Sequence, residues 1–348
     1  MFNVLRPLIF KFNPETAHSM AIKALKFGYI PPVKINKSSL IELSIFNKKL
    51  YSPVGIAAGF DKNAEVYNSL FNLGFALVEV GTVTPKPQYG NPKPRVFRLE
   101  EDQALINRLG FNNQGSEEIR LRIEKNKPKG LLGINIGPNK DSINRINDYV
   151  QCFKRFHNLA DYLTINISSP NTEGLRDFHD QKELQDLLRA INNEKNSLNS
   201  KIPIAVKLSP DLNQNQIENV SEVLIKNKIS VAIVSNSTDK NREKLININK
   251  LEKGGLSGKP LEKISNNIIN RFHKLIGKKI KIIGVGGADS AEGVYEKILN
   301  GASLVQLYTG MVYKGPQIAA QINKKLVKIL EKDGIKNIEE VVGSKKSS

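Results

Sequence analysis

The chain has 348 residues, 40% of them hydrophobic and 25% charged, which fits one large globular domain and excludes a membrane-like or disordered composition. Its single cysteine, Cys152, excludes a disulfide framework and a cysteine-rich metal site, and it indicates a reducing compartment. The net charge of +18 suits nucleic acid, an anionic membrane surface or an acidic small substrate. However, much of the excess is lysine on expected helix surfaces, and no arginine-aromatic alternation marks a nucleic-acid platform, so we expect no nucleic-acid partner.

Residues 1–40 are predicted to form a helical extension. Asn13 followed by Pro14 is typical of a helix N-cap with proline in the first turn. Apolar residues then recur at helical spacing over 17–25, which predicts an amphipathic helix. Arg6 and Lys11 interrupt the preceding apolar run, so we expect neither a signal peptide nor a membrane-spanning helix. The apolar stripe either covers the rest of the protein or faces a membrane, and the residues alone favour neither.

From residue 54 onward, short apolar β-rich runs alternate with helical patterns, which is typical of a parallel sheet built from βαβ units. Eight such units predict an α/β fold, a (β/α)₈ TIM barrel, over residues 41–335. The connection 84–114 is unusually long, and such connections are usually functional. Residues 336–348 are predicted to be a short helical end and a polar tail. The predicted strands span residues 54–58, 77–81, 131–136, 162–167, 204–208, 231–235, 281–285 and 304–308.

Polar residues gather at the carboxyl ends of these strands, where barrel enzymes assemble their active sites. A barrel that served only as a scaffold would need no such ring. Lys62 and Lys207 would ordinarily be surface lysines, but at strand ends they are predicted to be interior ammonium groups that need an anionic partner. The ring comprises Asp61, Lys62, Thr82, Asn135, Asn166, Ser168, Ser169, Lys207, Ser235, Asn236, Tyr308 and Thr309.

Glycine-rich segments near the last strands predict a phosphate site. Gly286 and Gly287 precede a helix expected to begin near Ser290, so backbone N–H groups and a helix N-terminus can face an anion. Residues 308–310 repeat this pattern, and 254–258 form a third segment, predicted to be flexible. Turns explain most glycines singly, but together these segments indicate a phosphorylated cofactor. We expect no metal, because no His, Asp and Glu cluster has ligand spacing, and no dinucleotide fingerprint follows the first strand.

Four stretches closely resemble the dihydroorotate dehydrogenase family: residues 57–62 (AAGFDK), 107–113 (NRLGFNN), 166–171 (NISSPN) and 255–258 (GLSG). The resemblance runs in order from about residue 40 to about residue 325, and the N-terminal extension is similar to that of the membrane-associated, quinone-dependent class 2 branch. It implies FMN-dependent oxidation of (S)-dihydroorotate to orotate in de novo pyrimidine (UMP) biosynthesis, with a quinone as electron acceptor. Residues 41–335 would then be the FMN-binding domain.

The resemblance also implies residue roles. Ser169 stands where the other branch typically has cysteine, and it would remove the C5 proton while a hydride passes from C6 to flavin N5. Since serine is a poor base, Thr172 or a water would have to drain the proton. The residues implied for FMN are Ala58, Gly59, Phe60, Asp61, Lys62, Thr82, Asn135, Asn166, Lys207, Ser235, Gly258, Gly287, Tyr308 and Thr309. Those implied for the dihydropyrimidine are Lys62, Asn107, Arg108, Leu109, Gly110, Phe111, Asn166, Asn171, Asn236 and Ser237.

The extension 1–40 would place the protein peripherally on the cytoplasmic side of the inner membrane and admit the quinone. His18 and Arg98 are candidates for the quinone side, and a monomer is the expected state. Ser235 and Ser237 stand where the family often has threonine, which keeps the hydroxyl but loosens its rotamer. This departure bears on affinity more than on the type of reaction.

Two rival functions remain open. A tRNA dihydrouridine synthase is another FMN barrel and would explain the basic charge through phosphate contacts. That family relies on a loop cysteine, however, and Cys152 lies in a stretch predicted to be helical, away from any strand end. The other rival is a non-enzymatic barrel that binds flavin or RNA, which predicts no flavin bleaching when dihydroorotate is added.

Overall fold

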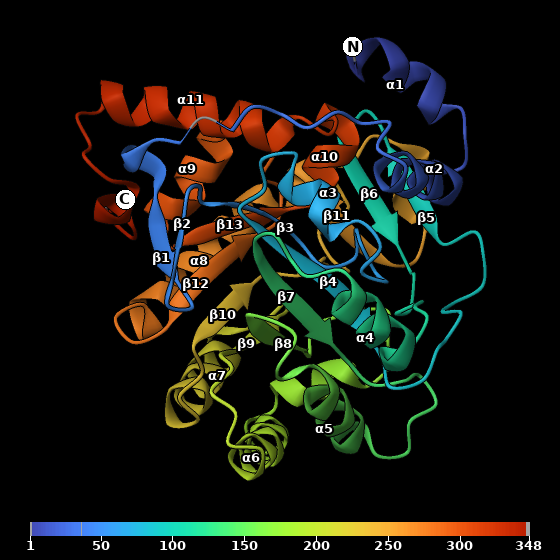
Figure 1. The fold of residues 1–348 in the computed structure, drawn as a ribbon, viewed down its shortest axis with the longest axis vertical. Helices are drawn as coiled ribbons and strands as arrows, with labels where there is room; N and C mark the ends of the chain where they lie inside the picture. Colours follow the sequence, from blue (N-terminus) through green and yellow to red (C-terminus); the bar gives the residue numbers. More distant parts are fainter. Residues whose placement is uncertain (1, 36, 346–348) are drawn as a thin grey trace.

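The computed structural model describes residues 2–35 and 37–345 and confirms the (β/α)₈ barrel. Eight parallel strands close on themselves in the order β10-β12-β13-β3-β4-β7-β8-β9, and helices surround them (Figure 1). Every predicted strand is found, to within two residues at its ends. The barrel strands are β3 (Val54–Ile56), β4 (Leu77–Val83), β7 (Leu131–Ile136), β8 (Tyr162–Asn166), β9 (Ile204–Leu208), β10 (Val231–Val234), β12 (Lys281–Val285) and β13 (Leu304–Leu307).

The apolar runs form strands because the barrel strands are covered on both faces, so nearly every position is buried. The amino end of the barrel is closed by a hairpin of β1 (Leu43–Ile45) and β2 (Lys48–Leu50). Phe46, in its turn, stacks on Tyr162 with ring centroids 4.2 Å apart. Because the hairpin closes the amino end of the barrel, a ligand site can form at the carboxyl end.

The outer layer consists of the helices that follow the barrel strands, together with short 3₁₀ turns. Their apolar faces pack on the barrel, and the last turn, η5 (Ile338–Val341), buries Ile338 and Val341 in the same core. The helices are α3 (Tyr67–Phe71), α4 (Ser116–Lys125), α5 (Arg145–Phe156), α6 (Gln181–Ser197), α7 (Gln214–Lys226), α8 (Glu262–Ile276), α9 (Ala291–Leu299), α10 (Thr309–Lys314) and α11 (Ile318–Lys332). The other 3₁₀ turns are η1 (Ser39–Ile41), η2 (Leu175–His179), η3 (Ile248–Leu251) and η4 (Lys259–Leu261).

The long connection 84–114 is partly a β-sheet. Its strands β5 (Val96–Leu99) and β6 (Ala104–Asn107) pair antiparallel, and β6 also pairs with β11 (Gly255–Gly258). The prediction of a flexible segment over 254–258 is therefore wrong, because residues 255–258 form β11, an edge strand of this sheet. Gly258 has φ +100°, and a Cβ there would lie 2.4 Å from the Gln103 carbonyl oxygen, so this glycine allows a close backbone approach.

The N-terminal extension forms two helices, α1 (Phe2–Phe10) and α2 (Pro14–Lys26), and α2 contacts β5 (Figure 1). The predicted cap is confirmed, since the Asn13 side chain accepts a hydrogen bond from the Glu15 N–H at 3.0 Å. Within residues 2–35 and 37–345, no helix combines the length and apolar character needed to cross a bilayer.

Candidate active site

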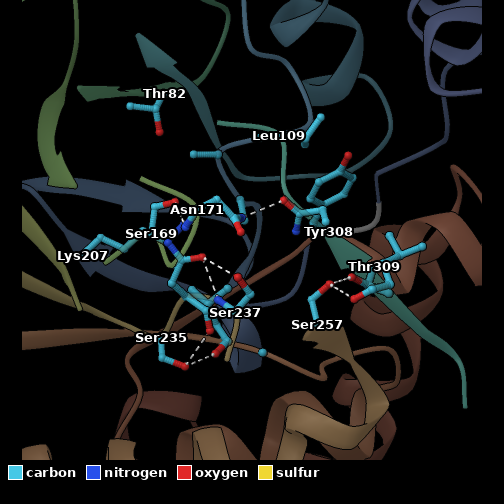
Figure 2. Close-up of a pocket in the computed structure, with 18 of the residues that line it drawn as sticks. Thr82, Leu109, Ser169, Asn171, Lys207, Ser235, Ser237, Ser257, Tyr308 and Thr309 are labelled. Carbon is cyan, nitrogen blue, oxygen red and sulfur yellow. Dashed lines mark hydrogen bonds between the residues drawn. The ribbon is translucent and has the colours of Figure 1, made fainter. Parts of the chain in front are cut away.

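A pocket of about 1150 Å³, including the part open to solvent, lies at the carboxyl end of the barrel. Residues from the strand ends and from the small sheet line it together (Figure 2). The convergence predicted for the strand-end residues is thus largely present. The predicted site residues on its wall are Ala58, Gly59, Lys62, Thr82, Asn107, Leu109, Gly110, Phe111, Asn166, Ser169, Asn171, Lys207, Ser235, Asn236, Ser237, Gly258, Gly287, Tyr308 and Thr309.

Ser169 stands in the loop that leaves β8, where the strand ends in Asn166. Its side chain is buried, and its hydroxyl accepts a hydrogen bond from the Asn171 N–H at 3.2 Å. The neighbouring Ser168 hydroxyl donates to Asn166 Oδ1 and accepts from Asn236 Nδ2, both at 2.8 Å. The serine loop is therefore tied to side-chain amides on two sides, and these amides can both donate and accept toward a ligand.

Asn135 lies behind the pocket wall rather than on it. Its Oδ1 accepts from the Thr82 hydroxyl at 2.6 Å and from Asn166 Nδ2 at 3.1 Å, while its Nδ2 donates to Glu79 Oε1 at 2.8 Å. These bonds fix which way both wall residues present their polar atoms. Glu79 was not predicted from the sequence, because a glutamate inside a continuous apolar strand has no local partner to reveal its role.

The two strand-end lysines both reach the pocket. Lys207 is buried, and burial lowers its pKa while the negative charge of Glu79 works in the opposite direction. Lys62 is partly exposed, and its ammonium donates to the Gly59 carbonyl oxygen at 2.7 Å. The ammonium group itself is nevertheless buried, and this burial lowers its pKa to about 8. Both groups therefore favour an anionic partner that compensates for their lost hydration.

The other end of the pocket has the features expected of a phosphate site. The hydroxyls of Ser257 and Thr309 lie 2.9 Å apart there. Gly287 has φ +74°, and a Cβ on it would lie 2.6 Å from the Glu262 backbone nitrogen, so this loop has room only for bare backbone. The expected helix follows, because α9 begins after Ser290, whose hydroxyl accepts the Gly293 N–H at 3.0 Å.

Two charged residues of the predicted site point elsewhere. The Asp61 carboxylate accepts the N–H groups of Glu65 and Val66, both at 2.8 Å, and burial raises its pKa to about 6. It closes a turn and does not line the pocket. Arg108 pairs with Glu252 at 2.8 Å, and its guanidinium lies over the Phe97 ring. Arg108 directly follows β6, and these contacts direct its side chain away from the pocket wall.

His18, from α2, lies at the edge of the site beside Phe60, which is also absent from the pocket wall. The two rings meet edge to face with centroids 5.2 Å apart, and Phe60 meets Tyr308 in the same way at 5.8 Å. Burial, and next the positive charge of Lys62, lower the pKa of His18 to about 3. The helical extension therefore presents a neutral imidazole at the edge of the pocket.

Arg98 connects the extension to the small sheet. Its guanidinium donates to the carbonyl oxygens of Phe10 and Phe12 at 3.0 and 2.9 Å. A second tie, not predicted from the sequence, joins Glu15 on α2 to buried Arg95, whose Nη2 lies 2.5 Å from the carboxylate. Residues 80 positions apart form this pair, and neither one differs locally from a surface charge.

Comparisons with known proteins agree with this geometry. A family model described as dihydroorotate dehydrogenase matches residues 40–330. A dihydroorotate dehydrogenase (quinone) of Bartonella henselae is 44% identical over 337 residues, covering 96% of this chain and 93% of that protein. One from Parvibaculum lavamentivorans is 42% identical over 345 residues, covering 99% and 98%. The crystal structure of the Eimeria tenella enzyme in complex with ferulenol superimposes with a TM-score of 0.93 at 36% identity, covering 98% of each chain.

Dihydroorotate dehydrogenases are flavin-dependent oxidoreductases that oxidise dihydroorotate in pyrimidine synthesis, and the two bacterial relatives named above are of the quinone-linked kind. The family model covers well over half of the chain, and the relatives exceed 40% identity along almost all of it. The chain, a (β/α)₈ barrel, therefore belongs to the dihydroorotate dehydrogenase family.

Proposed function

We propose that this protein catalyses the FMN-dependent oxidation of (S)-dihydroorotate to orotate, acts as a monomer, and passes the electrons to a quinone. The observation that carries the proposal is that one pocket gathers the Ser169 hydroxyl, the amides of Asn171 and Asn236, and the ammonium groups of Lys62 and Lys207. A base, neutral donors and acceptors, and cations are the groups that an anionic dihydropyrimidine requires.

The pocket fits FMN in size and chemistry. Its glycine-lined end, where a Cβ on Gly258 or Gly287 would meet backbone atoms, suits a phosphate held by N–H groups. The chemistry that FMN supplies when bound is the acceptance of a hydride, here from C6 of the substrate. The residues we assign to it are Ala58, Gly59, Thr82, Asn166, Lys207 and Ser235 for the ring and ribityl chain, and Gly258, Gly287, Tyr308 and Thr309 toward the phosphate.

We assign Ser169 as the general base. It takes the proton from C5 as C6 loses a hydride, so the substrate loses two hydrogens and gains the C5=C6 double bond of orotate. A hydroxyl is a weak base unless its proton can leave. Thr172, buried in the same loop, is the hydroxyl that we assign to that relay.

Substrate orientation falls to the amide side chains around Ser169. Asn171 Nδ2 donates to Asn107 Oδ1 at 3.4 Å, a long bond that can be exchanged for a ligand contact. Asn236 is already held by the Ser168 hydroxyl, so its remaining amide atoms have a defined direction. Lys62 supplies a cation for the substrate carboxylate.

The test is anaerobic mixing of the purified flavoprotein with dihydroorotate, with flavin bleaching followed by absorbance. Ser169→Ala should lower the rate of bleaching by about 10²–10⁴-fold, the usual contribution of a general base. Ser230→Ala is the matched control, because this exposed serine precedes β10 at the opposite end of the barrel. A wild-type protein that stays yellow with dihydroorotate but is reduced by NADPH and then reoxidised by an RNA substrate would contradict the proposal.

We further propose that α1 and α2 dock on the cytoplasmic face of the inner membrane and admit the quinone past His18 and Arg98. The support is a set of exposed apolar side chains, including Val4 (81% exposed) and Leu8 (58%) on α1 and Phe27 (66%) just after α2. The two helices also carry lysine and arginine. Such a surface suits anionic lipid.

Deleting residues 1–35 should preserve flavin reduction by dihydroorotate but slow turnover with a long-chain quinone. The double variant Val4→Glu/Leu8→Glu should no longer sediment with vesicles that contain anionic lipid. Ile143→Glu is the control, because Ile143 is fully exposed and lies outside the extension. Unchanged quinone kinetics after the deletion would remove the docking proposal.

A further inference from the structure

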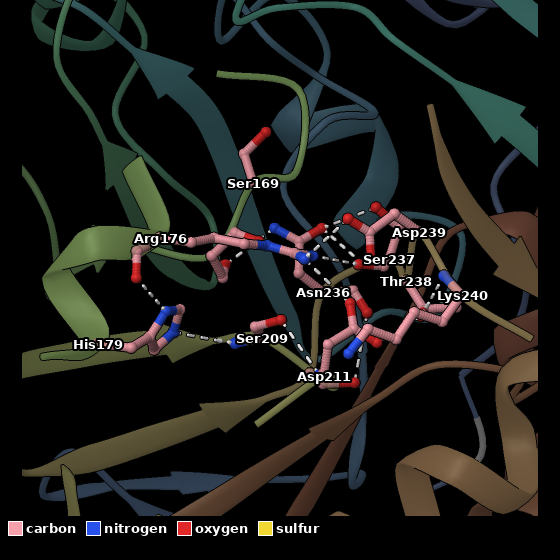
Figure 3. Close-up of polar contacts among 12 residues, drawn as sticks. Ser169, Arg176, His179, Ser209, Asp211, Asn236, Ser237, Thr238, Asp239 and Lys240 are labelled. Atoms are coloured by element: carbon pink, nitrogen blue, oxygen red, sulfur yellow. Dashed lines mark hydrogen bonds and ion pairs between the residues drawn. The ribbon is translucent and has the colours of Figure 1, made fainter. Parts of the chain in front are cut away.

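Arg176 is an unassigned residue that joins three loops at the rim of the barrel (Figure 3). It lies in η2, in the same β8–α6 connection that carries Ser169. Its Nε donates to the Ser168 carbonyl oxygen at 3.2 Å, and its Nη2 donates to the Ser237 carbonyl oxygen at 3.1 Å. One guanidinium therefore holds the backbone beside the assigned base and the backbone beside the assigned substrate amide.

The remaining nitrogen of the fork, Nη1, makes two ion pairs. It lies 3.0 Å from an oxygen of Asp211 and 3.4 Å from an oxygen of Asp239. The Asp211 side chain is 7% exposed and also accepts the Thr238 hydroxyl, whereas the Asp239 side chain is 50% exposed. The inner carboxylate thus anchors the guanidinium to the loop after β9, while the outer carboxylate contributes less because water screens it.

The main chain of Arg176 is held as firmly as its side chain. His179 Nδ1 lies 2.9 Å from the Arg176 carbonyl oxygen, and His179 Nε2 accepts the Ser209 N–H at 3.3 Å. Both bonds form only when the imidazole is neutral and carries its proton on Nδ1. Burial lowers the pKa of His179 to about 4, so this arrangement persists across the neutral range.

This geometry needs a planar fork with several fixed donors, which arginine has and lysine lacks. A second bridge, from Asn236 Nδ2 to the Ser168 hydroxyl at 2.8 Å, connects the same two loops. A shift of the Ser168 carbonyl would therefore move both the neighbouring Ser169 and the amide of Asn236. Arg176 itself is not among the residues that line the pocket.

We propose that Arg176 is a positioning residue for the oxidation of the dihydropyrimidine, because it clamps the Ser169 loop against the Asn236–Ser237 loop and so fixes the distance from base to substrate. This inference rests on the proposed function and adds a residue to its first half-reaction only. Reoxidation by quinone needs neither loop, so it should not depend on Arg176.

The test measures the two half-reactions separately by stopped flow, as flavin reduction by dihydroorotate and flavin reoxidation by a short-chain soluble quinone. Arg176→Ala should slow reduction by about 100-fold, the effect of misplacing a reacting group by about 1 Å, with reoxidation and bound FMN unchanged. Arg176→Lys should fall between this variant and the wild type, and Asp239→Asn should have a smaller effect of the same kind. Added guanidinium ion should restore part of the rate of Arg176→Ala.

Arg189→Lys is the matched control, because Arg189 forms an exposed pair with Asp186 on α6 and touches neither loop. Equal losses in both half-reactions, or wild-type reduction rates in both Arg176 variants, would overturn the positioning role. If Arg176→Ala does not fold, the same split between half-reactions must appear in Arg176→Lys and Asp239→Asn, and its absence overturns the role equally. A wild-type flavin that dihydroorotate does not reduce would instead refute the proposed function itself.

Discussion

Glu79 offers a sharp test of how the barrel interior supports the site. This carboxylate is fully buried in β4, and its Oε1 accepts from Asn135 Nδ2 at 2.8 Å. Its Oε2 accepts from the Tyr162 hydroxyl at 2.8 Å and from Gln306 Nε2 at 3.0 Å. It also provides negative charge toward Lys207. Both oxygens of Glu79 thus accept hydrogen bonds from neighbouring donors. Its charge also raises the pKa of Lys207, against the lowering caused by burial.

We expect Glu79→Gln to reduce the free energy of unfolding by about 3 kcal/mol. Whichever way the new amide turns, its NH₂ group faces a donor, and a lost hydrogen bond to a charged group costs about 1.5–3 kcal/mol. Removing one partner of a buried charge pair costs about 3–5 kcal/mol. The lower part of that range applies, because Lys207 can release its proton instead of remaining an uncompensated cation.

The loss of unfolding free energy in Glu79→Gln should depend on pH because of Lys207. Burial already lowers its pKa, and loss of the Glu79 charge must lower it further in the folded variant. At pH values below both of these folded pKa values, Lys207 is charged in both proteins, and the variant bears the full cost of a buried ammonium without its carboxylate partner. The stability gap between variant and wild type should therefore narrow as pH rises through the interval between those two values.

The assay is urea denaturation followed by far-ultraviolet circular dichroism at a series of pH values, since the chain has no tryptophan. Glu118→Gln is the control, because this glutamate is 58% exposed and forms only a helix-surface pair with Arg122. Its effect should stay within about 0.5 kcal/mol. A Glu79→Gln protein within the same limit, or a gap that does not change with pH, would refute the role given to this carboxylate.

Two further predictions concern the phosphate end and the helical extension. Gly287→Ala should lower the amount of FMN retained per chain after gel filtration, because the new Cβ would lie 2.6 Å from the Glu262 backbone nitrogen. Gly334→Ala is the control, because Gly334 has φ +69° and open space around it, and this variant should retain as much FMN per chain as the wild type. In the wild type, stability should rise with pH between about 3 and 6.5, since a histidine whose folded pKa is lowered binds more protons in the unfolded state. His18→Gln should flatten this rise. Urea midpoints at pH 4 and pH 7 measure the slope, and an unchanged slope would contradict the neutral state assigned to His18.

The barrel strands were predictable because their burial is nearly uniform. A parallel strand covered by helices outside and side chains inside has no polar face, so it is visible in the sequence as an uninterrupted apolar run. Residues 231–234 are of this kind. Residues 131–136 and 204–208 are also buried throughout, and each has a single polar residue at its penultimate position, Asn135 or Lys207. The strand-end residues followed from the strands, because a parallel barrel brings all carboxyl ends to one rim.

The small sheet was not predictable from local pattern. β11 consists of Gly255–Gly258, a sequence that resembles a turn, and its partner β6 lies about 150 residues earlier in the chain. Residues 255–258 form a strand because they pair with β6, which is distant in sequence, and because Gly258 leaves no room for a side chain against the Gln103 carbonyl oxygen. The ion pairs Glu15–Arg95 and Arg176–Asp211 were hidden for a similar reason, because a charged residue has the same local signature in a surface pair as in a buried one.

The neighbours Asp61 and Lys62 show why a motif does not assign roles to its members. Both stand in the loop that follows β3, and both were predicted to contact the cofactor. The structure directs the Asp61 carboxylate to the N–H groups of its own turn, and only the Lys62 side chain lines the pocket. The turn that Asp61 closes sets the direction of Lys62, so a substitution at Asp61 should affect ligand binding indirectly, through the backbone. Arg176 has the same relation to Ser169: in each segment, one polar side chain holds the loop and another lines the pocket, and only atomic contacts tell them apart.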